Sequence, residues 1–429
     1  MISFRYNRYF WKLIQLDLDD REILWYKAAM LWLFRIIPVL FLYTGMVIYT
    51  GFRFFAFGRF LRPSLKALIF WPLYGILAYH FVFLALFRLD RIKLLRLAGM
   101  YWLPFFVYLF SLILLLDLIS CVLSQIRKKR RNPLQQNCTV RIMPAGAGAA
   151  LVLTLIVLLY GSIHAQDIRT VRYELSIPGK TGMESFRIIL VSDLHIGPTV
   201  GKAWTARIVD LINDASPDMV CIPGDIFESG LEGMVDQEEI AAELRRINAP
   251  LGVYACPGNH DTDRRTRSTG AIARFLAQTG IIFLQDEVAH LPGTGIFVAG
   301  RKDPRPIGLQ DPRLSMEEFA ASIDGTIRDS EIGNGPDKPL VILLDHQPLE
   351  LGQAAEAGID LVLCGHTHRG QFFPADFITR LMFRGYGGTN YGLWRKNNTQ
   401  AVVTSGAGVW GPPVRIGTNS EIAVLDLWF

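Results

Sequence analysis

Four long apolar stretches near the start of the chain place the strongest constraint on its fold. They run over 31–50, 67–87, 100–123 and 145–163. Each is close to the ~20 residues that an α-helix needs to cross the hydrocarbon core of a bilayer, and loops rich in Arg and Lys separate them. The whole chain of 429 residues is 51% hydrophobic, which is high for a wholly soluble protein. The sequence therefore predicts about four transmembrane helices rather than buried helices of a soluble domain.

The composition changes on both sides of these stretches. Residues 1–30 mix aromatic and charged side chains, so we expect an interfacial or cytosolic segment there. Over 166–429, short apolar runs alternate with helix-like stretches, which is typical of an α/β domain. We therefore divide the chain into an N-terminal segment (1–30), a transmembrane region (31–165) and one folded domain (166–429).

Two ionisable residues lie deep in the apolar stretches. His80 and Asp117 could form a functional intramembrane pair, because charged groups in a bilayer are costly and often mark a functional site. A hydrogen bond between helices would satisfy them equally well. We expect this second, structural role.

The basic residues between the stretches predict the orientation of the chain. The densest cluster follows the third stretch and contains Arg127, Lys128, Lys129, Arg130, Arg131 and Arg141. By the positive-inside rule this end is cytoplasmic, so the fourth helix leads out of the cytoplasm and the folded domain is extracytoplasmic. A second basic group, Arg88, Arg91, Lys93 and Arg96, favours the opposite topology. We expect the extracytoplasmic placement.

The net charge of +5 does not indicate a nucleic-acid partner. Many of the basic residues flank the apolar stretches, where membrane topology or anionic lipid accounts for them. Five cysteines without a Cys-x-x-Cys pair do not predict a disulfide framework. Cys221, Cys256 and Cys364 each end an apolar run, so we expect them to be buried as small hydrophobic side chains.

Polar clusters follow five short apolar runs of the predicted α/β domain. The clusters are Asp193-Leu194-His195, Gly224-Asp225, Gly258-Asn259-His260-Asp261, His346 and Gly365-His366-Thr367-His368. Any one of them could be an ordinary turn, since Gly, Asn and Asp are common turn residues. In a largely parallel sheet, however, the carboxyl ends of the strands lie along one edge. We therefore expect the five clusters to converge.

The converging side chains are the ligand types of a metal centre. Carboxylates, an amide and imidazoles suit Mn, Fe or Zn, and the lack of cysteine in the clusters argues against a thiolate site. Asp-x-His and His-x-His would place alternate side chains on one side of an extended backbone, so each pair is expected to reach one pocket. The ligands are too many for one ion. Two ions that share a hydroxide would support in-line hydrolysis of a phosphate ester.

The five clusters, complete and in this order, resemble the calcineurin-like metallophosphoesterases. The resemblance covers about 180–429. Three segments, 192–195, 366–371 and 406–415, are similar to a branch of membrane-associated phosphodiesterases that includes YkuE-like proteins and the transmembrane protein with metallophosphoesterase domain. The resemblance implies a four-layer α/β fold, in which two mixed sheets are flanked by helices.

The resemblance also implies a role for each site residue. It assigns one divalent ion to Asp193, His195 and His368, and the other ion to Asn259, His346 and His366. Asp225 would bridge the two ions. His260, held by Asp261, would act as an outer-sphere acid or as a hydrogen-bond donor to the transition state.

Basic residues near the clusters bear on substrate binding. Arg369 follows the last histidine and would bind a phosphate oxygen if it points inward, whereas a solvated arginine is the alternative. Arg264, Arg265 and Arg267 pose the same choice between steering an anionic substrate and lying on a solvated helix face.

The membrane helices bear on the function. They make a lipid-linked phosphodiester or pyrophosphate the expected substrate and the lipid bilayer a partner. The alternative function is a non-catalytic metal-binding scaffold or sensor coupled to the helices.

Overall fold

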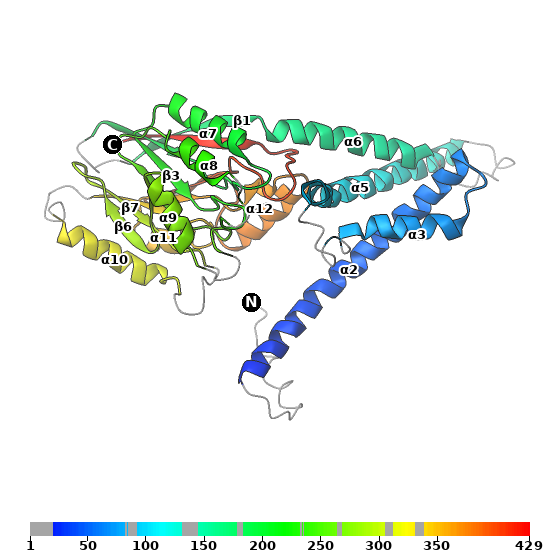
Figure 1. The fold of residues 1–429 in the computed structure, drawn as a ribbon, viewed down its shortest axis with the longest axis horizontal. Coiled ribbons are helices and arrows are strands. Elements are labelled where there is room, and N and C mark those ends of the chain that lie inside the picture. Colours follow the sequence, from blue (N-terminus) through cyan, green and yellow to red (C-terminus); the bar gives the residue numbers. More distant parts are fainter. Residues whose placement is uncertain are drawn as a thin grey trace. The chain divides into compact units, whose positions relative to one another are not determined.

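The computed structural model describes residues 20–81, 84, 92–130, 145–177, 183–231, 234, 236–263, 268–304, 312–330 and 339–429 (Figure 1). Most of the predicted interfacial segment, together with Arg131 and Arg141, lies outside these residues. The chain divides into two compact units. One comprises Met1–Phe87 and Phe106–Thr154, and the other comprises Arg88–Phe105 and Leu155–Phe429.

The N-terminal part of the chain forms apolar helices. They are α2 (Asp20–Leu61), α3 (Ala67–Ala78), α5 (Lys93–Arg130) and α6 (Ala145–Ala165). Three segments are long and apolar enough to cross a membrane, namely Ile37–Leu61, Leu94–Ile126 and Ala145–Ala165. Helix α3 has 12 residues, fewer than the ~20 that a crossing requires. Of the four predicted spans, the described residues thus contain three, and the second stretch contains a short apolar helix.

Asp117 joins two helices of the first unit. Its Oδ1 atom accepts a hydrogen bond from Arg53 Nη2 at 2.7 Å, and its Oδ2 atom accepts one from the Tyr49 hydroxyl. His80 lies elsewhere, with Nδ1 2.8 Å from the Leu77 carbonyl oxygen. A His80–Asp117 pair is therefore not formed, and Asp117 makes the contact between helices that we expected as its alternative.

Two six-stranded mixed sheets form the framework of the second unit. The first has the order β1-β12-β2-β3-β4-β5 and the second the order β10-β11-β9-β8-β7-β6. The strands of the first sheet are β1 (Ile168–Ser176), β2 (Ser185–Leu190), β3 (Met219–Pro223), β4 (Val253–Cys256), β5 (Ile281–Phe283) and β12 (Ser420–Trp428). Those of the second are β6 (Glu287–His290), β7 (Ile296–Gly300), β8 (Leu340–Leu344), β9 (Leu361–Cys364), β10 (Gly392–Lys396) and β11 (Thr399–Val403).

The centre of each sheet is parallel. In the first sheet β2, β3, β4 and β5 pair in parallel, and in the second sheet β7, β8, β9 and β11 do so. Antiparallel pairs lie beside them, between β12 and β2, between β6 and β7 and between β10 and β11. Parallel strands place their carboxyl ends at one edge of a sheet, so each sheet has one edge where polar loops gather.

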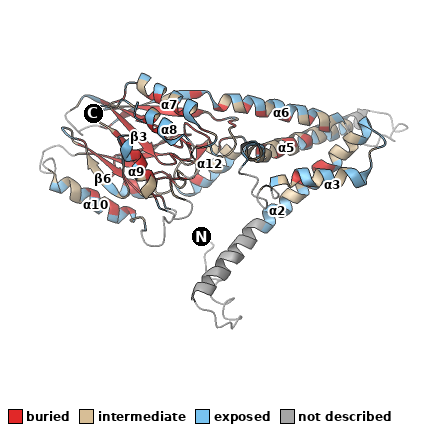
Figure 2. Ribbon diagram, viewed as in Figure 1, coloured by how far each residue is buried: buried red, intermediate tan, exposed pale blue. Residues whose placement is uncertain are grey.

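Apolar side chains fill the space between the two sheets and the space under the helices. Side chains on one strand point alternately to the two faces of a sheet. Accordingly, Ile188 and Leu190 of β2 join a core with Leu344 and other residues of the second sheet, whereas Ile189 packs in a core under helices. That helical layer is formed by α7 (Lys202–Asp214), α8 (Gln237–Leu244) and α9 (Gly270–Gln278), and the second sheet is covered by α10 (Met316–Asp329) and α11 (Leu351–Glu356). The sheets are the most deeply buried part (Figure 2). This confirms the four-layer α/β fold.

Candidate metal centre

All five predicted clusters lie directly after parallel strands, three in the first sheet and two in the second. Asp193 and His195 follow β2, Asp225 follows β3 and Asn259 follows β4, whereas His346 follows β8 and both His366 and His368 follow β9. The candidate centre therefore takes ligands from the carboxyl edges of both sheets. We expected the edge of a single sheet when we considered the strand pattern alone.

Asp193, His195 and His368 form one group of potential ligands. Each offers an atom that lies within 4.8 Å of the others, and all three residues are buried. The Nε2 atoms of the two histidines are 3.0 Å apart, and His368 Nε2 is 3.5 Å from Asp193 Oδ1. Burial lowers the pKa of His368, and the nearby positive charges of His195 and Arg415 lower it further. The neutral imidazole that a metal ion requires is thus favoured at this position.

Asp225, His346 and His366 form a second group with the same spacing. His346 Nε2 is 3.2 Å from Asp225 Oδ2, and the rings of His346 and His366 are 5.0 Å apart between centroids. The Oδ2 atom of Asp225 is also 3.7 Å from His195 Nε2 in the first group. Asp225 therefore lies between the two groups, where a bridging carboxylate would have to be.

Two buried atoms indicate that these groups suit metal ions. Asn259 Oδ1 and His346 Nε2 are buried and have no hydrogen-bond partner in the described part of the chain. The Nδ1 atom of His346 lies 2.9 Å from the Pro223 carbonyl oxygen, which can accept only from a protonated nitrogen. This contact leaves the lone pair on Nε2, as is usual for a histidine that binds a metal. The donor set is oxygen and imidazole nitrogen, which fits Mn, Zn or Fe.

The backbone at the ligands differs from our expectation. We predicted that Asp-x-His and His-x-His alternate along an extended strand, but the ligands have positive φ angles. These angles are 53° at Asp193, 47° at His195, 51° at Asp225, 71° at His366 and 46° at His368. Non-glycine residues rarely adopt this region, and each costs of order 1–3 kcal/mol. The side chains meet because the loops turn sharply after each strand.

Hydrogen bonds between the loops hold these turns. Asp193 N donates to the Gly224 carbonyl at 3.1 Å, and His195 N donates to the Asp225 carbonyl at 3.0 Å. His366 N donates to the Asp193 carboxylate at 3.0 Å, which ties the second sheet to the first. A β-carbon at Gly365 would lie 2.0 Å from Ser192 Oγ and 2.3 Å from Asp193 Oδ2. Glycine is therefore required at position 365, because the Ser192 and Asp193 side chains leave no room for a β-carbon.

His260 is oriented by a residue that we did not predict. Its Nδ1 atom is 2.8 Å from the carbonyl oxygen of Glu228, and among the described residues no hydrogen bond joins its side chain to Asp261. The buried carboxylate of Asp261 accepts hydrogen bonds from the backbone N–H groups of Ile226, Phe227 and Gly258. The expectation that Asp261 holds His260 is therefore wrong. Asp261 instead braces the loops after β3 and β4.

Two charged residues beside the centre escaped the sequence analysis. The Glu228 carboxylate is 3.3 Å from His195 Nδ1. Arg415 is fully buried and donates to the carbonyl oxygens of His368, Ser405, Gly406 and Gly408. Glu228 lies three residues after Asp225 outside any motif, and its role depends on the loop conformation. Arg415 is the last residue of the 406–415 segment. The family resemblance pointed to this segment but gave Arg415 no role.

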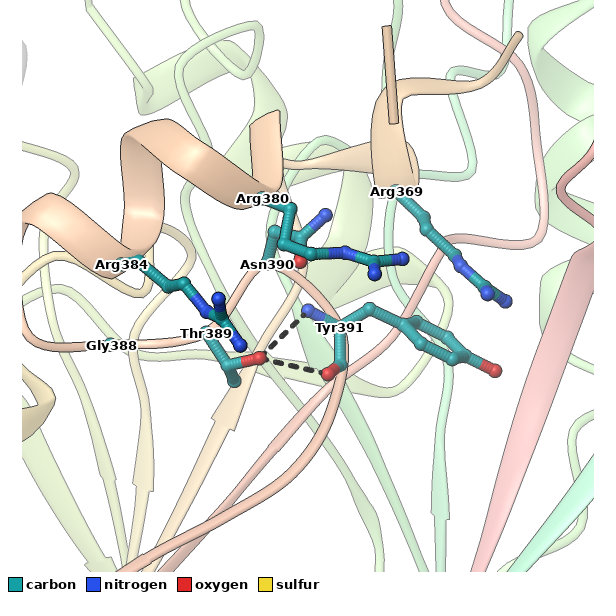
Figure 3. Close-up of a pocket in the computed structure, with 7 residues that line it drawn as sticks. All are labelled: Arg369, Arg380, Arg384, Gly388, Thr389, Asn390 and Tyr391. Atoms are coloured by element: carbon teal, nitrogen blue, oxygen red, sulfur yellow. Dashed lines mark hydrogen bonds between the residues drawn. The ribbon is translucent and has the colours of Figure 1, made fainter. Parts of the chain in front are cut away.

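Arg369, which directly follows His368 in the chain, lines a pocket of ≈ 190 Å³ (Figure 3). Its guanidinium carbon lies 4.3 Å from the centroid of the Tyr391 ring. Helix α12 (Ala375–Gly385) contributes Arg380 and Arg384 to the same pocket. Arg369 thus points into a basic pocket rather than lying alone in solvent. Arg264, Arg265 and Arg267 lie outside the described residues.

Comparisons with known proteins agree with the motifs. Residues 186–370 match the family described as Calcineurin-like phosphoesterase. A transmembrane protein with metallophosphoesterase domain from Danio rerio is 34% identical over 289 residues, which cover 65% of this chain and 62% of that protein. An uncharacterized metallophosphoesterase from Helicobacter pylori is 32% identical over 57% of this chain and 60% of its own length. The metallophosphoesterase YkuE from Bacillus subtilis is 25% identical, covering 57% and 80%. The chain thus spans less than two thirds of the first two relatives.

Proposed function

Because residues 186–370 of this chain form a calcineurin-like metallophosphoesterase domain, we propose that the protein is a membrane-anchored dimetal phosphoesterase. Its reaction would be hydrolysis of a phosphodiester or pyrophosphate bond in a lipid-linked substrate. The observation that carries the proposal is the position of Asp225 Oδ2, 3.2 Å from His346 Nε2 and 3.7 Å from His195 Nε2. Two divalent ions, Mn, Zn or Fe, would supply an activated water molecule and stabilise the charge on the phosphoryl oxygens.

The ligands divide between two positions in this proposal. Asp193, His195 and His368 would hold one ion, Asn259, His346 and His366 would hold the other, and Asp225 would contact both. The arrangement is supported by the two ligand groups and by the unpartnered Asn259 Oδ1 atom. The hydrogen bonds that fix the ligand loops would keep the donor atoms in place before an ion binds.

His260 would act on the leaving group rather than as a ligand. Its Nδ1 atom is held by the Glu228 carbonyl oxygen, so Nε2 is the nitrogen left for proton transfer. A protonated imidazole at this position can donate to the leaving oxygen as the bond to phosphorus breaks. Asp261 would contribute indirectly, because its hydrogen bonds fix the loop that carries Asn259 and His260.

The proposed function also has a location. Three candidate membrane spans support a location in a membrane. We place the metallophosphoesterase domain outside the cytoplasm, because α5 ends in the basic residues Arg127–Arg130 and α6 leads from that side to the domain. A reporter fused after Phe429 tests this placement. Activity of an alkaline phosphatase fusion supports it, and fluorescence of a green fluorescent protein fusion contradicts it.

Hydrolysis of bis-p-nitrophenyl phosphate by the full-length protein with added Mn tests the activity. We expect turnover in the wild type and in Asp324→Ala, which removes an exposed carboxylate from α10. Turnover should be lost in Asp225→Ala and His260→Ala. Activity retained by both of these variants would reject the site assignment. A protein that binds the metal but hydrolyses neither this compound nor a lipid extract would be the non-catalytic scaffold.

A further inference from the structure

Helix α12 presents an apolar face that the rest of the domain does not cover. Phe377, Ile378, Leu381 and Met382 are 57%, 53%, 55% and 55% exposed. These positions are spaced by one and four residues, so they lie on one side of the helix. Phe373 before the helix and Tyr386 after it are also exposed. An exposed apolar surface of this kind marks a site of interaction with a membrane or another protein.

The opposite face of α12 packs against the metal centre. Phe383 is buried, and its ring centroid lies 6.5 Å from that of His366. Thr379 Oγ1 accepts a hydrogen bond from Asn390 at 3.1 Å, and the Asn390 carbonyl oxygen accepts one from Thr367 in the ligand loop. The orientation of α12 is therefore fixed by the catalytic domain, and its apolar face points away from that domain.

The segment 414–416, which is hydrogen-bonded to the residue before α12, lies against the last turns of α6, the final candidate membrane span. Arg415 N donates to the Gly161 carbonyl oxygen at 2.9 Å, and a β-carbon at Gly161 would lie 2.7 Å from side-chain atoms of Val414 and Ile416. The Ile416 carbonyl oxygen in turn accepts a hydrogen bond from Phe373 N at 2.9 Å. Gly161 is four residues from the end of the span at Ala165, or about 6 Å along the helix. The start of α12 is thus linked through Ile416 to the C-terminal end of a candidate membrane span.

The arginines of α12 lie beside its apolar face and point into the pocket with Arg369 (Figure 3). Among the described residues, the pocket is lined by three guanidinium groups and by uncharged residues, and by no acidic side chain. Neither Arg380 nor Arg384 forms an ion pair with another residue in the described ranges. Planar guanidinium groups bind phosphate through paired hydrogen bonds, so the pocket is complementary to a phosphate group.

We propose that α12 is an interfacial helix and that the arginine pocket binds the headgroup phosphate of an anionic phospholipid. The apolar face of α12 lies among the acyl chains, and Arg369, Arg380 and Arg384 hold the headgroup. Arg369 directly follows His368 in the chain. Basic residues beside an apolar helical face are the pattern of helices that lie in the bilayer surface. If this lipid is also the substrate, its phosphate enters the metal centre from the plane of the membrane. That part of the inference rests on the proposed function.

Calorimetric titration of the full-length protein in a neutral detergent tests the lipid site. The compounds titrated are dioctanoyl phosphatidylglycerol, dioctanoyl phosphatidylcholine and glycerol phosphate. A chelator removes divalent ions, so that binding of phosphate to a metal ion does not contribute to the heat. We expect phosphatidylglycerol to bind more than ten-fold tighter than either of the others. Binding should weaken at least ten-fold in Arg380→Gln/Arg384→Gln and in Phe377→Ser/Leu381→Ser.

Matched variants control for charge and for exposed apolar area. Arg328→Gln on α10 and Ile282→Ser on β5 change exposed residues far along the chain from the pocket, so phosphatidylglycerol binding should remain. Equal binding of phosphatidylcholine would reject the phosphate site. Binding of glycerol phosphate as tight as that of the lipid, and unaffected by Phe377→Ser/Leu381→Ser, would show a site for free phosphate and would reject the interfacial helix.

A separate measurement distinguishes this inference from the proposed function. Wild-type protein is assayed for hydrolysis of bis-p-nitrophenyl phosphate, a soluble compound that needs no lipid site. Hydrolysis without preferential phosphatidylglycerol binding overturns the lipid site alone. Lipid binding without hydrolysis overturns the phosphoesterase proposal and leaves the lipid site standing.

Discussion

The Nε2 atoms of His195 and His368 lie 3.0 Å apart although the two residues are separated by 173 positions in the chain. His195 follows a strand of the first sheet and His368 follows a strand of the second. Their contact therefore depends on the packing of both sheets through the core that contains Leu190 and Leu344. The proposed ligands come from both sheets, so metal binding would require the two sheets to be packed correctly.

Metal binding should stabilise the folded domain. Ions that bind the folded state alone raise its stability by about 2.7 kcal/mol when their concentration is 100 times the dissociation constant. We expect the unfolding temperature of the full-length protein to rise with Mn and to fall with a chelator. Asp193→Ala should abolish the shift, because it removes a ligand and the acceptor for His366 N. A shift of full size in that variant would contradict the ligand assignment.

Gly365→Ala should damage the site by steric overlap. Its β-carbon would lie 2.0 Å from Ser192 Oγ, and relief of such an overlap typically costs about 1–3 kcal/mol. We expect a lower unfolding temperature and weaker binding of Mn. Gly325→Ala in α10 is the matched control, because nothing lies within 4 Å of its β-carbon. Alanine is favoured over glycine inside a helix by about 0.5–1 kcal/mol, so this control should be neutral or stabilising. Equal effects of the two substitutions would refute the steric argument.

Glu350 should make the stability depend on pH. Burial raises the pKa of its carboxyl, but hydrogen bonds and charge from Arg301 and Arg313 outweigh burial, so the pKa lies below its ordinary value of 4.5. A lowered folded-state pKa means that the stabilisation is complete above pH 4.5 and is lost as pH falls through the folded value. Glu350→Gln should therefore unfold at a lower temperature than wild type at pH 7, with a smaller difference below pH 4. Glu317→Gln, on the exposed face of α10, serves as the control. A difference that does not shrink in acid would contradict the ion pairing.

Asp117 should contribute to stability and not to catalysis. It accepts hydrogen bonds from Arg53 and Tyr49, and both ion-pair side chains are largely buried, at 11% and 16% exposure. Breaking a buried pair by removing one partner is typically destabilising by about 3–5 kcal/mol. Asp117→Ala should lower the unfolding temperature in detergent, whereas the hydrolysis rate per folded molecule should stay at the wild-type level. A selective loss of turnover with unchanged stability would instead assign Asp117 a functional role.

Much of the fold could be predicted because apolar runs and polar motifs are visible in short stretches of sequence. Each of the five apolar runs overlaps a strand, each polar cluster follows a strand, and the match over 186–370 confirms the family resemblance. The division of the strands into two sheets had no such signal. Strands β3 and β8 are both buried throughout, so their side chains do not reveal which sheet they belong to.

The site details that were missed depend on tertiary geometry. The left-handed backbone at Asp193 and His366 is imposed by contacts between loops, and these residue types do not require it. The carbonyl group that orients His260 belongs to Glu228, and any residue could have supplied it. For the second membrane stretch, 67–87, the described helix α3 ends at Ala78, and part of the remainder lies outside the described residues.

The metal content of the purified protein tests the central claim most directly. Elemental analysis after loading with Mn and removal of free ions should give two ions per full-length chain. The content should fall in Asp225→Ala and remain at two in His290→Ala, because His290 lies in β6 and contacts the Thr294 carbonyl oxygen. A wild-type protein that retains no divalent ion, or an Asp225→Ala variant that still retains two, would contradict the dimetal centre.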